Sequence, residues 1–245
     1  MLEHIHLGQI LFLDIETAPS CSSLSSLPSY EQELWEEKRG RFRPEDISQE
    51  AYYFQQAAIF AEFGKIICIS AGYFKDNSIN TFNITTTKSD NEIDILQEFS
   101  VWINKFHKKW GSNMLLCGHN IKEFDIPYIC RRYLATGLVK EFPTYLQRLR
   151  DLKPWESPLL DTMDIWRFGD YKNFISLKLL AHILQVPSPK NDISGADVAH
   201  VYYEEHDLDR IKKYCARDVL TLAQILLKVK GIPILEESDI HILAG

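Results

Sequence analysis

The stretch ILFLDIETAP, residues Ile10 to Pro19, is almost wholly apolar and ends in two carboxylates, Asp14 and Glu16. Successive side chains of a strand point to opposite faces, so these carboxylates lie side by side on one face. The residues upstream of them, and the neighbours that point the other way, are apolar. Strands that are apolar on both faces are typical of the centre of a largely parallel sheet, so the stretch predicts an α/β fold.

Two adjacent carboxylates in a buried strand repel each other and lose their hydration. They are tolerated when they are protonated, hydrogen-bonded or bound to a cation. The alternative is that the strand ends at Asp14, and that Asp14, Glu16 and Thr17 begin a solvated turn. Polar residues elsewhere in the chain must decide between these two interpretations.

The composition of the 245 residues is that of an ordinary globular protein, with 45% apolar and 25% charged residues. This length fits a single domain, 1–245, better than two domains. The formal net charge of -7 argues against a protein that coats nucleic acid through bulk electrostatics. A local basic groove is compatible with that charge, because phosphate recognition needs only a few placed Lys and Arg residues.

The cysteine pattern indicates a reduced compartment. The 5 cysteines are scattered and form no C-x-x-C pair, so they predict neither a disulfide framework nor a structural zinc site. The beginning, MLEHIHLGQ, contains no long apolar segment, and no other window approaches the length of a membrane span. From these features we expect a cytoplasmic protein.

The rest of the chain alternates strand and helix patterns, as an α/β protein does. Residues 20–62 are polar, rich in aromatic residues and interrupted by two prolines, so we expect an insertion of loop and short helices between the first two strands. Further strands are expected at 65–74, at 78–85 as its hairpin partner across KDN, at 113–120 and near 158–166. Helices are expected at 90–110, around 124–136, at 174–185 and at 207–230.

The last of these helices carries a carboxylate on its apolar stripe. On a helical wheel Asp218 falls among the apolar residues that would face the core. Tyr214 stands one turn earlier, from where its phenol can reach whatever Asp218 holds. The alternatives are that Asp218 pairs with Arg217, Lys213 or a backbone amide, and that Tyr214 is an ordinary residue at the edge of the core.

Another carboxylate, Asp125, stands where a helix would begin, in GHNIKEFDIPYICRR. One interpretation makes it only the N-cap of that helix. The other lets it converge with Asp14, Glu16 and Asp218, and such oxygen ligands suit Mg²⁺ or Mn²⁺ rather than zinc. Two such ions about 3.5–4 Å apart cleave phosphodiesters, one activating the attacking water and the other stabilising the leaving oxygen. Asp14 would be the bridging ligand.

Three motifs in this order resemble those of the DEDD superfamily of 3′–5′ exonucleases: Asp14-x-Glu16, Asn120 with Phe124-Asp125, and Tyr214-x-x-x-Asp218. The third motif is similar to the tyrosine branch, in which a Tyr replaces the His of the other branch. More closely, the chain resembles predicted stand-alone exonucleases related to the proofreading domain of family B DNA polymerases. This resemblance covers about residues 10–230 and includes FGKIICISAGYF, SLKLLAHILQV and DISGADVAHVYYEEHDLDRIKKYCARDVLTL.

The resemblance implies an RNase H-like fold with a mixed five-stranded sheet flanked by helices. It implies two divalent cations, Mg²⁺ or Mn²⁺, held by Asp14, Glu16, Asp125 and Asp218, and a water oriented by Tyr214. The chemistry agrees, because phosphoryl transfer mainly requires positioning and charge neutralisation. The sequence has neither a G-x-S-x-G nucleophile motif nor a G-x-x-x-x-G-K-[ST] phosphate loop.

The resemblance also implies three residues beside the terminal nucleotide: the backbone at Thr17, the side chain of Asn120 and the ring of Phe124. The alternatives are that Asn120 caps the following helix and that Phe124 belongs to the core. Candidate phosphate contacts elsewhere in the chain are Lys122, Arg131, Arg132, Lys172, Lys178 and Lys190.

Four further polar residues are left out of the predicted site. The neighbours of Asp161 and Asp164 indicate a strand end or a helix cap, although both compete for a place among the metal ligands. His119 and His182 are interpreted as structural histidines.

We therefore expect a metal-dependent 3′–5′ exonuclease that acts on single-stranded DNA or unpaired 3′ ends, releases nucleoside 5′-monophosphates and serves in DNA repair. DNA is the expected partner ahead of RNA, and an exoribonuclease is the alternative within the same chemistry, distinguished only by contacts to a 2′-hydroxyl. A non-catalytic module that holds 3′ ends is the alternative from another class. Such a module would be expected to lack an acid or the tyrosine, and this sequence has all five residues.

Overall fold

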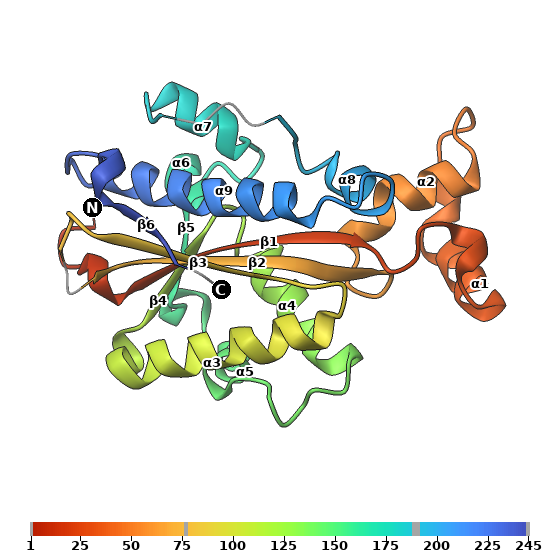
Figure 1. The fold of residues 1–245 in the computed structure, drawn as a ribbon, viewed down its shortest axis with the longest axis horizontal. Coiled ribbons are helices and arrows are strands. Elements are labelled where there is room, and N and C mark those ends of the chain that lie inside the picture. The colour runs from red at the N-terminus through yellow and green to blue at the C-terminus, as the bar shows by residue number, and fades with distance from the viewer. Residues whose placement is uncertain (1, 76–77, 188–191, 244–245) are drawn as a thin grey trace.

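The computed structural model describes residues 2–75, 78–187 and 192–243. The strands are β1 (Ile10–Pro19), β2 (Gly64–Phe74), β3 (Phe82–Lys88), β4 (Leu115–Gly118), β5 (Leu159–Asp161) and β6 (Ile240–Ile242). They form one six-stranded sheet in the order β5-β4-β1-β2-β3-β6. Helices cover both faces of the sheet, so the expected α/β class is confirmed (Figure 1).

β1 lies inside the sheet, parallel to β4 on one side and antiparallel to β2 on the other. β3 pairs antiparallel with β2, and β5 and β6 pair parallel with β4 and β3. The sheet is therefore mixed, as expected, but the expected count of five strands is wrong. The sixth strand is β6, whose 3 residues are too few to show an alternating pattern in the sequence.

Two layers of helices enclose the sheet. The helices are α1 (Ser29–Lys38), α2 (Gln49–Gln56), α3 (Glu92–Trp110), α4 (Asp125–Ala135), α5 (Thr144–Leu149), α6 (Thr162–Arg167), α7 (Leu177–Ile183), α8 (Val198–Tyr203) and α9 (Leu208–Val229). In Figure 1, α3, α4 and α5 lie below the sheet, and α6 to α9 lie above it.

The alternation of β1 divides the core between these layers. Leu11, Leu13 and Ile15 pack in the cluster that includes residues of α3 and α4. Ile10 and Phe12 pack on the opposite side, in the cluster that includes residues of α9. Asp14 and Glu16 continue the second series along the strand, so the two carboxylates belong to the face that α9 covers.

The hairpin partner of β2 lies further along the chain than the predicted range of 78–85. β3 begins at Phe82, and the amide of Lys75 donates to the carbonyl oxygen of Thr81 at 2.9 Å across the connecting loop. The alternation of residues 78–81 resembles a strand, but these residues belong to the loop. Residues 76 and 77 of the expected KDN turn lie outside the described residues.

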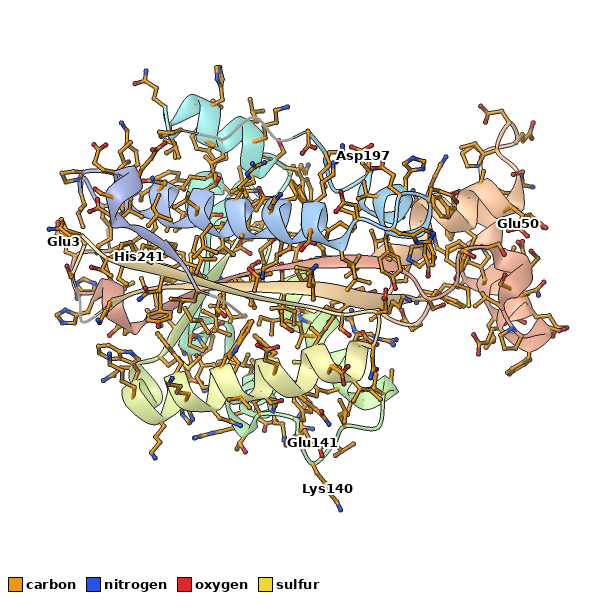
Figure 2. The ribbon with its side chains drawn as sticks, viewed as in Figure 1. Glu3, Glu50, Lys140, Glu141, Asp197 and His241 are labelled. Atoms are coloured by element: carbon orange, nitrogen blue, oxygen red, sulfur yellow. The ribbon has the colours of Figure 1, made fainter. Side chains whose placement is uncertain are left out.

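The segment between β1 and β2 contains α1 and α2 and lies at one end of the molecule (Figure 1). It has a small core of its own, in which Trp35 is fully buried and meets Tyr53 and Phe63 edge-on at 5.3 and 5.2 Å. Glu50, labelled in Figure 2, accepts hydrogen bonds from the amides of Leu24 and Ser25 at 2.7 and 3.0 Å. These bonds link α2 to the loop that leaves β1.

The five cysteines all lie in the described part of the chain and are free thiols, in agreement with the sequence. None of the helices within the described ranges is long and apolar enough to cross a membrane.

Candidate active site

The first two acids of the candidate site, Asp14 and Glu16, lie on β1 in a mostly buried environment. Glu16 is 7% exposed, and the Oδ2 atom of Asp14 is buried without a hydrogen-bond partner among the described residues. The pairing with β2 continues past both acids to Pro19, although its register shifts between Glu16 and Thr17. The alternative in which the strand ends at Asp14 is therefore wrong.

The helix α9 brings Tyr214 and Asp218 to these acids. The Cys215 thiol donates to the backbone carbonyl oxygen of Asp14 at 3.4 Å, which ties the helix to β1. The Tyr214 hydroxyl and the Asp218 carboxylate are hydrogen-bonded to each other. The charge of Asp218 acts on both Asp14 and Glu16 and raises the pKa of each, so Asp218 lies beside the pair.

Asp125 reaches β1 from the other side. The pairing of β4 with β1 ends at Phe12, which leaves the next part of that edge of β1 without a strand partner. The amide of Ile15 on this edge donates to the Asp125 carboxylate. Asp125 is the first residue of α4 and is 4% exposed, while Phe124 occupies the N-cap position. The alternative that Asp125 is only the N-cap is therefore wrong.

Burial and mutual repulsion raise the pKa values of acids in this site. Burial raises the pKa of Asp14 and of Glu16 well above the ordinary values, and the neighbouring carboxylates raise both further. Burial also raises the pKa of Asp125 to about 7, although the amides of Asp125 and Ile15 favour its charged form. Such a cluster binds protons or cations, because either one removes the repulsion.

The arrangement fits a divalent cation. Ligand atoms of Asp14, Glu16 and Cys215 lie within 4.8 Å of one another, and the buried Oδ2 of Asp14 lacks a partner in the described structure. Asp125 and Asp218 lie close enough to shift the pKa of Asp14. Carboxylate oxygens are the ligands that Mg²⁺ and Mn²⁺ prefer, so this acid cluster can hold such an ion.

A family model described as a predicted 3′-5′ exonuclease related to the exonuclease domain of PolB matches residues 59–233. The chain belongs to this family. The matched range includes Asp125, Tyr214 and Asp218 and begins after β1, so it is the structure that brings Asp14 and Glu16 to the other three residues. No curated protein is similar enough in sequence to count as a match.

The fold of this chain is similar to that of a solved polymerase. The family B DNA polymerase from the hyperthermophilic archaeon Pyrobaculum calidifontis matches with a TM-score of 0.53 and 15% sequence identity, over 94% of this chain. This chain spans 26% of the length of that polymerase. The likeness confirms the expected RNase H-like fold.

The predicted substrate residues lie on β1 and on the segment between β4 and α4. Thr17 follows Glu16 at the register shift in β1. Asn120 has a φ of 61°, in the left-handed region that Asn tolerates better than most residues, and its amide donates to Asp161. Because Phe124 is the residue at the N-cap position, Asn120 does not cap α4. The Phe124 ring is half-buried and packs on Tyr128 at 5.4 Å, at the edge of the core.

Asp161 and His119 are structural residues, as expected. The Asp161 carboxylate accepts hydrogen bonds from the amides of Asn120, Lys122 and Met163 at 2.9, 3.2 and 2.9 Å. It thereby caps α6 and holds the loop that leads to Asp125. His119 hydrogen-bonds to Thr162 at 2.9 Å and to the carbonyl of Ile175 at 2.8 Å.

His182 was expected to be a satisfied histidine in an apolar run, but it is exposed on α7. Leu180 and Ala181 of that short helix pack in a cluster with residues of α6 and α9, whereas the histidine lies on the outer side.

Two of the expected phosphate contacts form ion pairs within the chain. Arg132 pairs with buried Glu92 at 2.6 Å, and Lys122 pairs with Asp164 at 2.9 Å. Arg131, Lys172 and Lys178 are exposed, and Lys190 lies outside the described residues.

The sequence analysis did not name Lys213 and Arg217 of α9 as phosphate contacts. They each stand one residue before Tyr214 and Asp218, and they line a surface depression of about 390 Å³ together with Arg210, Asp192 and Asp207. The signal was available in the sequence, because residues four apart share one side of a helix.

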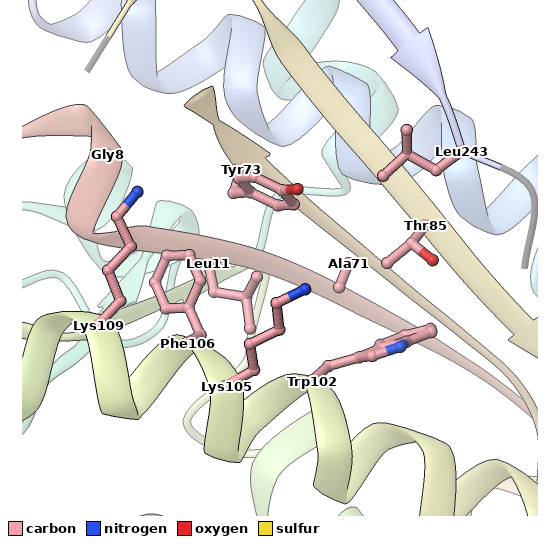
Figure 3. Close-up of a pocket in the computed structure, with 10 residues that line it drawn as sticks. All are labelled: Gly8, Leu11, Ala71, Tyr73, Thr85, Trp102, Lys105, Phe106, Lys109 and Leu243. Carbon is pink, nitrogen blue, oxygen red and sulfur yellow. The ribbon is translucent and has the colours of Figure 1, made fainter. Parts of the chain in front are cut away.

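A separate cavity of about 290 Å³ lies between α3 and the sheet (Figure 3). Leu11 of β1, Tyr73 of β2 and Trp102 of α3 are among its lining residues. Leu11 points to the α3 face, so this cavity is on the other side of the sheet from Asp14.

Proposed function

We propose that this chain is a metal-dependent 3′–5′ exonuclease, a single domain that removes nucleotides from single-stranded DNA or unpaired 3′ ends and releases nucleoside 5′-monophosphates. The observation that carries the proposal is the convergence of Asp14, Glu16, Asp125 and Asp218 from β1, α4 and α9, with Tyr214 beside them. The family match supports the same activity.

The four carboxylates would hold two divalent cations, Mg²⁺ or Mn²⁺. Such ions neutralise the charge that develops on the phosphate and steady the attacking and leaving oxygens. Asp14 is the natural shared ligand, because Asp218, Asp125 and Glu16 all lie close enough to couple to it. The protein contributes a rigid set of oxygens, since Asp125 is fixed by the Ile15 amide.

Tyr214 would position the attacking water. Burial and the charges of Glu16, Asp218 and Asp14 raise the pKa of its phenol well above the ordinary value, so the phenol stays protonated. A neutral hydroxyl cannot act as a base, but it can hold a water by hydrogen bonding. Its bond to Asp218 fixes the phenol in place.

The substrate would enter as an unpaired strand, because a paired terminus cannot bring its last phosphate into the buried acids. Lys213 and Arg217 offer phosphate contacts beside the Tyr214 and Asp218 pair. The Phe124 ring offers an edge against which the terminal base can pack, and the Thr17 backbone and Asn120 offer polar contacts.

The test is cleavage of 5′-labelled single strands of DNA and RNA with matched sequence, in Mg²⁺, Mn²⁺ or chelator. We expect a ladder that shortens from the 3′ end only with metal, with DNA cut faster than RNA. The Asp14→Asn variant should be inactive, and Asp164→Asn is the matched control, because Asp164 lies outside the acid cluster and pairs with Lys122. Binding of 3′ ends without cleavage by the wild type would instead support a non-catalytic module.

A further inference from the structure

Two thiols adjoin the acid cluster. The Sγ atom of Cys215 belongs to the same group of ligand atoms as Asp14 and Glu16, all within 4.8 Å of one another. Cys68 of β2 lies directly opposite Glu16 in the antiparallel register, so both side chains point to the α9 face. The Cys68 and Cys215 thiols are hydrogen-bonded to each other.

The surroundings of these thiols distinguish them from ordinary core cysteines. Both are fully buried, and the Cys215 thiol donates a weak hydrogen bond to the Asp14 carbonyl at 3.4 Å. The adjacent Oδ2 of Asp14 is buried and without a partner in the described structure. An unsatisfied carboxylate oxygen and a thiol therefore border the same position.

We propose that Asp14, Glu16 and Cys215, with Cys68 behind Cys215, form a mixed carboxylate and thiolate site that captures a thiophilic divalent cation such as Zn²⁺. On binding, Cys215 loses its proton to solvent and the sulfur–metal bond replaces the hydrogen bond to the Asp14 carbonyl. This inference rests on the proposed function only in treating the acid cluster as a cation site.

The thiol raises the affinity of the site only for metal ions that bind sulfur. Zn²⁺ binds thiolate and carboxylate together in tetrahedral sites, with sulfur at about 2.3 Å. Mg²⁺ takes oxygen ligands and gains nothing from sulfur. Zn²⁺ would therefore compete with Mg²⁺ at Asp14 and Glu16 and inhibit the exonuclease.

Co²⁺ reports on the thiolate directly, because a cobalt–thiolate bond gives a charge-transfer absorption band in the near ultraviolet. We expect this band when Co²⁺ is added to the metal-free wild type, and we expect Cys215→Ser to lack it. Cys117→Ser is the matched control, because Cys117 is an equally buried cysteine on β4 that lies outside the group around Asp14. This control should keep the band. Zn²⁺ should bind Cys215→Ser at least about tenfold more weakly than the wild type, with Mg²⁺ affinity unchanged.

X-ray absorption at the zinc edge tests the proposal without a variant. The wild type loaded with one Zn²⁺ should show a sulfur scatterer at about 2.3 Å. A shell of oxygen and nitrogen only, or a cobalt band that survives in Cys215→Ser, would overturn the inference. If the wild type cleaves in a metal-dependent way but lacks the cobalt–thiolate band, only this inference is wrong. If the wild type shows the band but does not cleave, only the proposed exonuclease activity is wrong.

Discussion

Asp14 is half-buried, has three neighbouring carboxylates, and carries a buried Oδ2 atom that has no hydrogen-bond partner in the described structure. Evolution of a stable fold alone would favour an apolar or amide side chain at this position, because an unpaired buried carboxylate costs free energy. In the proposed metal site, Asp14 therefore lowers the stability of the metal-free protein and supplies a strong cation ligand.

The first prediction concerns this residue. Asp14→Asn should reduce turnover by about a thousandfold or more, because the shared ligand of the cations is lost. The same change should leave the metal-free protein as stable as the wild type or more stable, because it removes a repelling charge. Thermal unfolding in chelator measures the second effect. A variant that unfolds more readily than the wild type would show that Asp14 stabilises the fold and would argue against the metal site.

The second prediction separates positioning from metal binding. Tyr214→Phe keeps the ring and removes the hydroxyl that is bonded to Asp218, so the cations should still bind. Turnover should fall by about 10- to 100-fold, less than for Asp14→Asn. Mn²⁺ affinity, measured by titration calorimetry, should stay within about twofold of the wild type. A large loss of Mn²⁺ affinity would mean that the phenol supports the metal ligands rather than the water.

Some contacts of these individual residues could be predicted from the sequence, and others could not. Strand alternation placed Asp14 and Glu16 on one face, and the apolar stripe of the last helix pointed Asp218 at the core. The bond between the Ile15 amide and Asp125 depends on where β4 stops pairing with β1, which no local pattern records. Cys215 has the pattern of a small core residue, so its closeness to the acids became visible only in three dimensions.

The position of α4, and with it Asp125, depends on an ion pair between elements. Glu92 in the first turn of α3 accepts from Arg132 of α4 and also from the Ile66 amide of β2, at 2.6 and 2.7 Å. Arg132 also donates to the carbonyl of Ala61, just before β2. One buried pair thus fixes two helices and a strand relative to one another.

The third prediction tests this link between elements. Glu92→Ala should lower the free energy of unfolding by about 3–5 kcal/mol, because it leaves the Arg132 guanidinium without its carboxylate partner in a mostly buried position. Asp94→Ala is the matched control, since Asp94 is an exposed acid in the same first turn. Its effect should stay within about 0.5 kcal/mol. Urea unfolding of both variants gives the comparison, and similar losses for the two would contradict the structural role of Glu92.

Elements with a strong period were predictable, and elements set by tertiary pairing were not. The period of α3 and α9 gave their ends to within two residues of the expected ranges 90–110 and 207–230. The beginning of β3 was misplaced because residues 78–81 alternate like a strand but lie in the loop. β6 is a strand of 3 residues that pairs in parallel with β3, a contact that no local pattern in the sequence records.

The fourth prediction concerns the stability of the whole molecule as a function of pH. Asp14, Glu16 and Asp125 all have raised pKa values in the folded state, and that of Asp125 is about 7. The unfolded chain releases these protons near pH 4, so the folded state holds more protons between about pH 4 and 7. The stabilisation is therefore complete below about pH 4 and is lost as the pH rises through about 7.

In chelator, the melting temperature should fall across this pH range, and the Asp125→Asn variant should show a smaller fall. Mg²⁺ or Mn²⁺ should restore stability at pH 8, because the ions bind the ionised carboxylates of the folded state only. If the melting temperature instead rises with pH in chelator, positively charged side chains of the protein, and not protons, neutralise the charge of the acids.

We propose that acids from β1, α4 and α9 form one divalent-cation site, and anomalous X-ray scattering from crystals grown with Mn²⁺ can locate the ions. We expect anomalous peaks among Asp14, Glu16, Asp125 and Asp218, and their loss in Asp14→Asn. Peaks only at surface carboxylates, or an acid cluster that stays free of Mn²⁺ at neutral pH, would contradict it.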